Sequence, residues 1–482
     1  MLFRQRRNTF FRIFDNFGYI INRLFTADKV LDASGGVFLQ ALSRKGQSLE
    51  TLTAKIAKSF QNVDINTLNS DVIDFLTMLE NDGFIVSGET EAELEAKDIC
   101  FSYSRHAGDH YKTAENRAGF AQQEIPETQK FLIEQCKTNP RLIQLHVDIT
   151  TRCNERCVHC YIPHNDKTID IDTVVFYNIL SQCREMGVLN FNISGGEPFL
   201  HPNFPDFLRK TQDYDLSVTV LTNLTVLNDE IIAVLKEAPI NSVHVSLYSM
   251  DSTIHDSITT LQGSFDKTYK NILKLIEQDI PLDISCPLMK QNKDTFWDVV
   301  QWGKKNGVYV LVDPTILARY DNSIDNLDNR LNLEEINKLF SDYILNDVDY
   351  QQLMLSRNVE KENTLDCDSI VCSACIMGLC INAKGNVYPC TGWNYGLGNL
   401  NEMSLREIWE SSSKAKYLRD LRMKDFPKCL NCPDIYFCNV CMARNANESP
   451  KGDIFNINDY HCQVAALNRE IVTTWKRKDA AR

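Results

Sequence analysis

Apolar and polar positions follow two different patterns along the chain, and the second is the clearer. From Leu142 onward, apolar runs of strand length recur at 142–149, 189–194, 216–221, 242–247, 281–286 and 308–312. Segments with helical spacing of apolar positions separate them. Parallel strands need such long crossover connections. We therefore expect an α/β fold over residues 141–320, a partial (βα)6 TIM-type barrel whose ligands bind at the carboxyl ends of the strands.

The first 88 residues show a different pattern. Short apolar runs between residues 10 and 30 flank a turn at Asp15-Asn16-Phe17-Gly18, which predicts a hairpin and a third strand. Helical spacing follows at 34–42, 48–60 and 66–80. These elements predict an N-terminal winged-helix-like α+β domain over residues 1–88.

The remaining chain divides into three segments. Residues 89–140 are acidic at first and then lack a clear period, which indicates a linker. Residues 321–366 contain a helical pattern from Asn332 to Leu345 and are interpreted as a helical connector. Residues 367–482 form a cysteine-rich C-terminal domain.

Charge and hydropathy exclude several classes of protein. The 482-residue chain has a net charge of −13, which argues against nucleic acid as a partner. No apolar run is long enough for a membrane span, and the opening MLFRQRRNTFFRIF lacks the apolar stretch of a secretory signal. We expect a cytoplasmic protein.

The cysteine content changes this picture. The chain has 17 cysteines, an odd number, in a sequence without an export signal, so paired disulfides explain them poorly. Ten of them fall between residues 367 and 462. Metal or cluster ligation is the better explanation.

Three cysteines directly follow the first predicted barrel strand. Cys153, Cys157 and Cys160 lie within eight residues of loop. Iron–sulfur clusters normally use four thiolates, so a compact triplet indicates a cluster with one open iron. Zinc ligation, or cysteines that share a loop by chance, are the alternatives.

This triplet, followed by Tyr161, resembles the signature loop of radical S-adenosylmethionine enzymes. In that family the amino and carboxylate groups of S-adenosylmethionine bind the open iron, and one electron cleaves the sulfonium to a 5′-deoxyadenosyl radical. Ser194-Gly195-Gly196-Glu197-Pro198, after the second strand, resembles the loop that binds the methionine amino group. Glycines allow close backbone approach, and Glu197 offers negative charge to an ammonium.

Two further positions resemble cofactor contacts of that family, and one departs from it. Asn223 after the third strand and Ser246 on the fourth match positions that line the ribose and carboxylate of the cofactor. For each residue an alternative is equally good: its side chain only makes hydrogen bonds to nearby backbone groups. Peptide-modifying members often carry an arginine shortly after a His-Asp pair, where this chain has Thr259. Another donor must therefore hold the carboxylate.

The C-terminal cysteines suit zinc ribbons as a generic interpretation, because paired Cys-x2-Cys units match tetrahedral zinc. Their order resembles instead the SPASM extension of radical S-adenosylmethionine enzymes, which holds two auxiliary 4Fe-4S clusters. With the cluster of the triplet, the resemblance implies three 4Fe-4S clusters. It implies that one auxiliary cluster is ligated by Cys429, Cys432, Cys438 and Cys462, and the other by Cys375, Cys390, Cys441 and a fourth residue, for which Cys372 ranks before Cys367 and Cys380.

Two details of this region depart from related subfamilies. The last spacing, between Cys438 and Cys441, is one residue shorter than usual. Sulfatase-maturing relatives place an acidic base after the cysteine that matches Cys390, where this chain has Thr391. This argues against formylglycine formation.

The N-terminal unit resembles the PqqD-like element of ribosomal peptide maturation, which binds a leader peptide as an added strand. Residues 10–86 match in element order. The open edge would lie at about residues 23–30, facing Leu68, Val72 and Phe75. The alternative is a winged-helix-like domain that only packs on the barrel.

Together these resemblances imply a radical S-adenosylmethionine peptide maturase. It would bind the leader of a precursor peptide and install an intramolecular crosslink, first a thioether from Cys to a carbon and second a carbon–carbon bond. A flavodoxin or ferredoxin would supply the electron. The rivals are a non-catalytic leader-binding scaffold and an enzyme that modifies a folded protein subunit.

Overall fold

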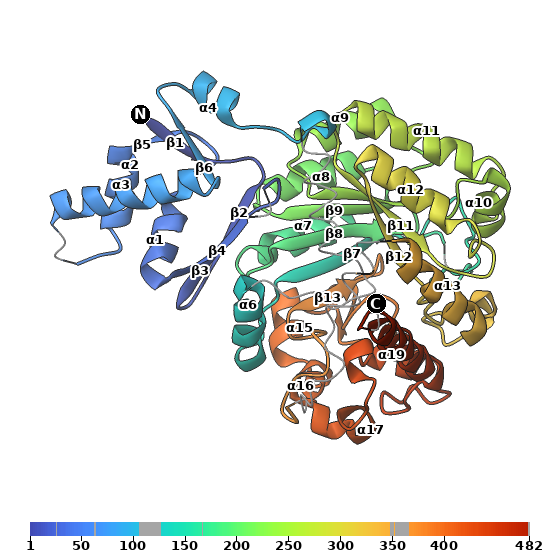
Figure 1. The fold of residues 1–482 in the computed structure, drawn as a ribbon. Helices are drawn as coiled ribbons and strands as arrows, with labels where there is room; N and C mark the ends of the chain where they lie inside the picture. The colour runs from blue at the N-terminus through green and yellow to red at the C-terminus, as the bar shows by residue number, and fades with distance from the viewer. Residues whose placement is uncertain are drawn as a thin grey trace.

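The computed structural model describes residues 1–25, 27–61, 64–105, 127–165, 167–347, 351 and 366–480. Figure 1 shows an N-terminal unit at the left, an α/β barrel, and a C-terminal unit packed below the barrel. Residues 106–126 of the predicted linker, and 348–350 and 352–365 of the predicted connector, lie outside the described residues. The domain boundaries remain predictions.

Six parallel strands form the barrel wall in chain order, from β7 to β12, and six helices, α7 to α12, join and cover them (Figure 1). The expected partial (βα)6 barrel is confirmed. Each strand of the wall overlaps one of the predicted apolar runs. The strands are β7 (Gln144–Thr150), β8 (Asn190–Gly195), β9 (Ser217–Thr222), β10 (Ser242–Ser246), β11 (Leu282–Pro287) and β12 (Tyr309–Asp313). The helices are α7 (Thr173–Cys183), α8 (Phe204–Gln212), α9 (Asp229–Glu237), α10 (Ser252–Thr259), α11 (Ser264–Glu277) and α12 (Phe296–Asn306).

Alternation along β7 separates the apolar core from the barrel interior. Leu145 and Val147 are fully buried and pack in the large core between the wall and its helices. His146 and Asp148, which alternate with them, therefore point to the opposite, inner face. The inner face of the barrel therefore carries polar side chains that could contact a ligand.

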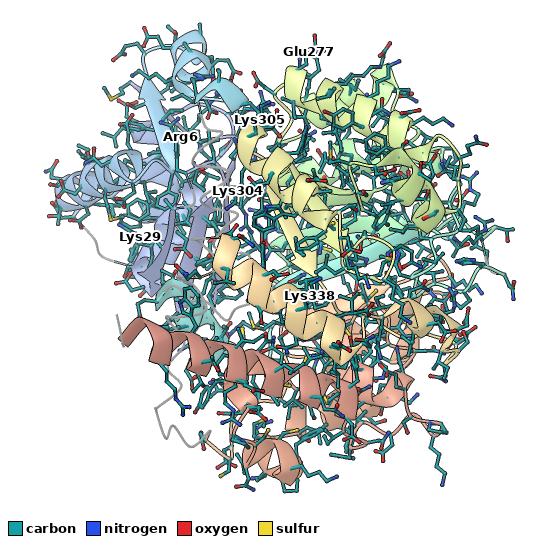
Figure 2. The ribbon with its side chains drawn as sticks, turned by 45° about the vertical axis from the view of Figure 1, so that its right-hand side comes forward. Arg6, Lys29, Glu277, Lys304, Lys305 and Lys338 are labelled. Carbon is teal, nitrogen blue, oxygen red and sulfur yellow. The ribbon has the colours of Figure 1, made fainter. Side chains whose placement is uncertain are left out.

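The C-terminal unit continues the same sheet. Strand β13 (Gly378–Ile381) pairs in parallel with β7, and β14 (Asn386–Tyr388) and β15 (Gly398–Asn399) follow it in antiparallel order. Figure 2 shows the long last helix, α19, beside α13 of the connector. The helices here are α13 (Leu333–Asn346), α15 (Leu405–Ser411), α16 (Ser413–Asp420), α17 (Pro427–Leu430), α18 (Met442–Asn447) and α19 (Asp459–Ala480).

The N-terminal unit has two small sheets rather than one. Besides the expected hairpin and third strand there are three short strands that the sequence analysis missed: β1, β5 and β6. The expected α+β class is nevertheless confirmed. The elements are β1 (Leu2–Gln5), β2 (Thr9–Phe14), β3 (Phe17–Asn22), β4 (Ala27–Asp32), α1 (Ala33–Ala41), β5 (Gln47–Ser48), α2 (Leu49–Ala57), α3 (Ile65–Asn81) and β6 (Ile85–Gly88), followed by α4 (Glu91–Lys97) and α6 (Glu127–Thr138) in the linker.

The predicted leader edge differs in detail from the structure. Strand β4 is the edge of the sheet β2-β3-β4, but it begins at Ala27 rather than Arg23. Leu68 and Val72 are 2% and 0% exposed and belong to the core of the unit, so they cannot line an open groove. Phe75 is only half-buried.

Buried charge docks the N-terminal unit onto the barrel. Arg12 on β2 is 3% exposed and donates to the Val188 and Asp215 carbonyl oxygens, at 2.7 and 2.8 Å. Arg44 forms an ion pair with the Asp215 carboxylate. Val188 and Asp215 precede β8 and β9, so the N-terminal unit sits at the amino ends of the barrel strands.

No helix in the described part of the chain is both long and apolar enough to cross a membrane.

Candidate active site

The loop after β7 carries the three cysteines singled out in the sequence. The backbone N–H of Cys160 donates to the Cys157 carbonyl oxygen at 3.1 Å, which folds the loop into a tight turn. Because β7 ends at Thr150, the loop lies at the carboxyl ends of the strands, where barrel enzymes bind their ligands.

The spacing of these thiols bears on the zinc alternative. Tetrahedral zinc, with Zn–S distances of about 2.3 Å, places its sulfurs about 3.8 Å apart. Among the described residues, the thiols of Cys153, Cys157 and Cys160 do not all lie within 4.8 Å of one another. In a 4Fe-4S cluster each thiolate binds its own iron, so the thiols need not lie that close together.

Burial and nearby charges shift the pKa values of the thiols in the triplet. Burial raises the pKa of Cys153 to about 11, and the nearby Lys167 ammonium opposes this. Burial also raises the pKa of Cys157 well above its usual value, and the Glu155 carboxylate adds to it. Such thiols ionise only when a metal ligates them. Lys167 is a buried cation, 9% exposed, that the sequence analysis missed.

Gly195 and Gly196 pack directly on the start of this loop. The backbone N–H groups of Gly196 and Glu197 donate to the carbonyl oxygens of Thr150 and Arg152, each at 2.8 Å. A Cβ on Gly196 would lie 2.3 Å from the Arg152 oxygen, so a larger residue cannot fit. The two glycines therefore fix the separation between the cysteine loop and the second strand end.

Glu197 is held by hydrogen bonds from two neighbouring strand ends. The side chain is fully buried, and its carboxylate accepts from Phe199 N at 3.0 Å, Thr222 Oγ1 at 2.7 Å and Asn223 N at 2.7 Å. Burial raises its pKa to about 7, although these three donors oppose the shift. Glu197 therefore ties two strand ends together, and its contact with the amino group of the cofactor remains a prediction.

Asn223 and Ser246 both lie near the triplet. The Asn223 Nδ2 atom is 3.9 Å from Cys153 Sγ, a weak sulfur contact, and 3.0 Å from Asn154 Oδ1. The Ser246 hydroxyl bonds to Tyr248, whose own hydroxyl is 3.9 Å from Cys157 Sγ.

His159, inside the triplet, was not selected from the sequence. Its ring packs edge-on against Tyr248 with centroids 5.2 Å apart, and burial lowers its pKa to about 4, so it stays neutral at pH 7. Its position immediately before the third cysteine was the available signal.

Tyr161 directly follows Cys160, the last cysteine of the triplet. It lines a cavity between the barrel and the C-terminal unit, together with Asp148, Cys380 and Cys390. Tyr161 therefore faces the C-terminal cysteines as well as the triplet.

Thr259 offers no positive charge where related enzymes carry arginine. It is fully buried in α10, and its hydroxyl donates to the Asp256 carbonyl oxygen at 3.3 Å. Arg156, Lys167 and Arg319 are cations held on the cysteine loop, through the carbonyl oxygens of Cys153 (2.6 Å), Glu155 (3.0 Å) and Cys160 (2.8 Å) respectively.

The C-terminal thiols lie in two neighbourhoods that adjoin at Cys438 and Cys441. Burial raises the pKa of Cys390 well above its usual value, and the thiols of Cys441, Cys372 and Cys375 add to this in that order. We call these four the inner set. Cys372, ranked first as the fourth residue, lies near Cys441 and Cys375.

The second set, the outer set, comprises Cys429, Cys432, Cys438 and Cys462. Burial raises the pKa of Cys429 to about 11, and the other three thiols add to the shift. Two other cysteines belong to neither set: Cys367 is exposed beside Asp366 and Asp368, and Cys380 lies beside His146 and Asp148 and near Cys390 of the inner set.

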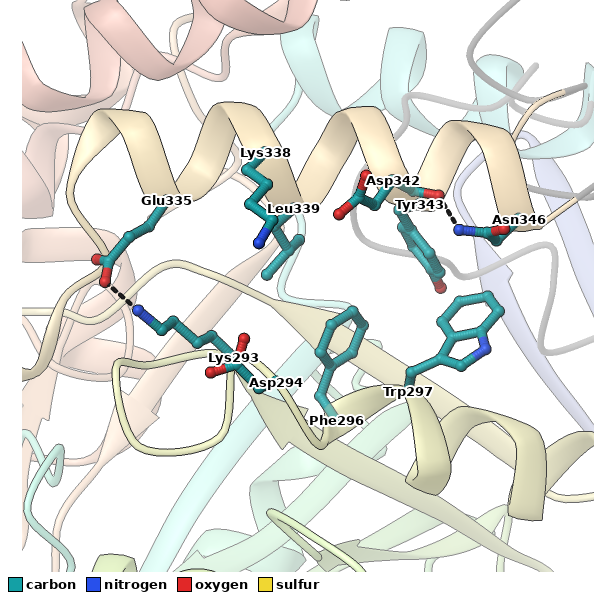
Figure 3. A pocket seen from close by; sticks show the side chains of 10 residues that line it. All are labelled: Lys293, Asp294, Phe296, Trp297, Glu335, Lys338, Leu339, Asp342, Tyr343 and Asn346. Carbon is teal, nitrogen blue, oxygen red and sulfur yellow. Dashed lines mark hydrogen bonds and ion pairs between the residues drawn. The ribbon is translucent and has the colours of Figure 1, made fainter.

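A separate hollow lies between the outer helices α12 and α13 and is lined by no cysteine (Figure 3). Lys293 forms an ion pair with Glu335 across it, and Trp297 packs edge-on against Tyr343 at 5.0 Å. This hollow holds no donor set for a cluster.

Three families match the chain in separate segments. Residues 147–303 match the radical SAM superfamily, residues 372–433 match the iron-sulfur cluster-binding domain SPASM, and residues 28–85 match coenzyme PQQ synthesis protein D, PqqD. The SPASM match begins at Cys372.

Curated relatives include an AdoMet-dependent heme synthase of Methanosarcina barkeri, 26% identical over 63% of this chain and 92% of its own. The antilisterial bacteriocin subtilosin biosynthesis protein AlbA of Bacillus subtilis is 25% identical over 70% of this chain and 72% of its own.

Among solved structures, Streptococcus suis SuiB bound to precursor peptide SuiA has a TM-score of 0.61 at 18% identity, covering 95% of this chain and all of SuiB. AnSMEcpe with bound AdoMet has a TM-score of 0.53 at 18% identity, covering 70% of this chain and 95% of its own. These likenesses establish the shared fold. The three domain matches show that the chain is a radical SAM enzyme that carries a SPASM domain and a PqqD domain.

Proposed function

We propose that this radical SAM enzyme binds the leader of a ribosomally made precursor peptide and installs an intramolecular crosslink in it. The proposal rests on the gathering of three thiols in the loop after β7 and of eight more in the C-terminal unit, which would form one set of three and two sets of four. A three-thiol set leaves one coordination position open, and two complete sets beside it suit electron transfer.

The donor sets fit the groups that such an enzyme needs. Cys153, Cys157 and Cys160 would hold the first 4Fe-4S cluster, and the inner and outer sets would hold the two auxiliary ones. S-adenosylmethionine would lie between this loop and Gly195-Gly196, near Asn223 and Ser246, with Tyr161 at the border of the site. When bound, these groups supply the 5′-deoxyadenosyl radical that abstracts hydrogen from the substrate.

The residues around the triplet contribute position and exclusion of water. Glu197 holds the second and third strand ends together, and Gly196 seats the cysteine loop on them. His159 and Tyr248 form an aromatic wall beside Cys157. A reactive species needs such a closed site because water would quench it.

Leader binding would use the free edge of β4. This strand is paired only with β3 among the described elements, so one row of its backbone groups remains open to an added strand. Lys29 on β4 forms an ion pair with Asp82 at the end of α3 (Figure 2), which holds strand and helix close to one another. The structures of SuiB bound to SuiA and the family match to PqqD support this assignment.

A thioether from a Cys sulfur to a carbon is our first choice of product, and a carbon–carbon crosslink the second. Either product removes two hydrogens: one leaves as an atom to the radical, and the other as a proton with one electron. The relative named subtilosin biosynthesis protein AlbA supports action on peptides. A flavodoxin or ferredoxin in the cytoplasm would supply the electron that starts the reaction.

The experiment uses anaerobically reconstituted enzyme and the short peptide encoded beside its gene. Reduction in the presence of S-adenosylmethionine should release deoxyadenosine and lower the peptide mass by two hydrogens. Protection of one cysteine from alkylation identifies the thioether, whereas full alkylation of the crosslinked product identifies the carbon–carbon bond. Absence of deoxyadenosine would contradict the radical chemistry itself.

A further inference from the structure

A histidine, an aspartate and a cysteine meet inside the barrel, outside all three thiol sets. One ligand atom from each of His146, Asp148 and Cys380 lies within 4.8 Å of the other two. His146 and Asp148 alternate on β7, and Cys380 is the register partner of His146 on β13. The backbone ladder between two strands therefore fixes the relative positions of all three.

These side chains are shielded from solvent. His146, Asp148 and Cys380 are 8%, 9% and 3% exposed. The His146 Nε2 atom lies 3.1 Å from Asp148 Oδ1. Two ligands of one tetrahedral zinc ion stand about 3.3 Å apart when both are nitrogen or oxygen, and about 3.6 Å when one is sulfur. The observed 3.1 Å between His146 Nε2 and Asp148 Oδ1 is compatible with a hydrogen bond and also with both atoms binding one zinc ion.

The local charge favours a cation here. Burial raises the pKa of Cys380 well above its usual value, and the Asp148 carboxylate and the Cys390 thiol add to it. The adjoining cavity has no lysine or arginine among the ten described residues that line it. A divalent ion would neutralise the aspartate and a Cys380 thiolate together.

The same cavity supplies an open coordination position. Both Asp148 and Cys380 line it, next to Tyr161 and Asn382. Its volume is about 30 Å³, which is enough for a water molecule. Three protein ligands and one open position are the arrangement of catalytic rather than structural zinc sites.

We infer that His146, Asp148 and Cys380 form a mononuclear site for a divalent transition metal of the zinc type. The mixed nitrogen, oxygen and sulfur donors suit zinc better than magnesium or calcium, which prefer oxygen ligands alone. The open position faces the cavity between the first cluster loop and the inner set. This inference stands independently of the proposed crosslinking function.

The test uses holoenzyme with its iron–sulfur clusters already assembled, so that the other thiols are occupied. Zinc is added alone, excess metal is removed with a weak chelator, and zinc and iron per chain are measured. Wild-type enzyme should retain about one zinc ion per chain without losing iron. X-ray absorption at the zinc edge should show one sulfur at about 2.3 Å and the remaining ligands at about 2.0 to 2.2 Å.

Two variants and one matched control make the result decisive. Cys380→Ser and Asp148→Asn should each lose the bound zinc while keeping wild-type iron content. Cys286→Ser should keep it, because Cys286 is a fully buried barrel cysteine that belongs to no such group of three ligands among the described residues. The inference is overturned if wild-type enzyme retains no stoichiometric zinc, if Cys380→Ser retains as much zinc as wild type, or if the bound zinc has only sulfur ligands.

Discussion

The guanidinium of Arg12 lies 3.7 Å from the carboxylate of Asp215, and this contact joins the N-terminal unit to the barrel. Burial lowers the pKa of Arg12 to about 10, and the charge of Asp215 opposes that shift. Arg184 lies 3.4 Å from the same carboxylate. One aspartate thus compensates several cations at the amino ends of the barrel strands.

Replacing Asp215 with asparagine should loosen this docking. Asparagine tolerates the left-handed backbone at this position (φ +53°), so the loss of charge is isolated from backbone strain. Leaving Arg12 buried and unpaired should cost about 3 kcal/mol, measurable as a lower melting temperature and faster proteolysis near the junction of the two units.

Asp213→Asn is the matched control for that change. Its ion pair with Lys210 is exposed, so its removal should change the melting temperature very little. Equal effects of the two substitutions would show that the Arg12–Asp215 contact does not hold the units together.

Gly196→Ala should weaken binding of S-adenosylmethionine. The added Cβ would lie 2.3 Å from the Arg152 oxygen and would push the cysteine loop off the second strand end. A displacement of about 1 Å can cost about a hundredfold in a positioned site, so we expect at least a tenfold rise in Kd by calorimetry. Gly396→Ala, where a Cβ meets nothing within 4 Å, should bind as wild type. An unchanged Kd in Gly196→Ala would remove the loop from the binding site.

Single alanine substitutions should separate the three thiol sets. Cys153→Ala, Cys390→Ala and Cys432→Ala should each lower the iron content by about four atoms per chain. Only Cys153→Ala should abolish the response of the reduced enzyme's paramagnetic spectrum to S-adenosylmethionine. Cys136→Ala, a buried cysteine on α6, should keep full iron content. A response that survives in Cys153→Ala would contradict the assignment of the triplet.

Stability should depend on pH through Glu197. Its folded pKa of about 7 lies above the ordinary value of 4.5, so the folded protein holds this proton more tightly than the unfolded chain does. The resulting stabilisation is fully present below about pH 4.5 and is lost as pH rises through about 7. The titration of Glu197 should therefore lower the melting temperature of wild-type enzyme as pH rises from about 4.5 to about 7.

Glu197→Gln removes the titrating group while keeping its shape. The difference in melting temperature between wild type and this variant should change with pH between about 4.5 and 7, and stay constant above that range. A difference that is independent of pH would show that the three hydrogen bonds to Glu197 outweigh its burial.

The local sequence was sufficient to predict elements whose buried residues form a regular apolar pattern along the chain. The barrel strands appeared as apolar runs because their outward faces pack on helices, as Leu145 and Val147 do. Strands β1, β5 and β6 were missed because each has only two to four residues and is defined by pairing with distant segments. The leader groove was misplaced for a similar reason: Leu68 and Val72 have the spacing of an apolar face, but that face is the core of the unit.

The candidate site divides in the same way. The spacing of the triplet and the Gly-Gly pair is local, so the sequence could indicate both. The partners of Glu197 come from a neighbouring strand end, and the burial of Lys167 depends on the folded loop, so neither was visible. The meeting of Cys380 with His146 depends on β13 joining the barrel sheet, which no pattern in either segment indicates.

The pairing of β13 with β7 also has a mechanical consequence. Backbone hydrogen bonds between β13 and β7 join the C-terminal domain to the barrel wall. The domain therefore cannot rotate away as a hinged lid unless these hydrogen bonds break. The separation between the cysteine loop after β7 and the C-terminal thiols is thereby held constant.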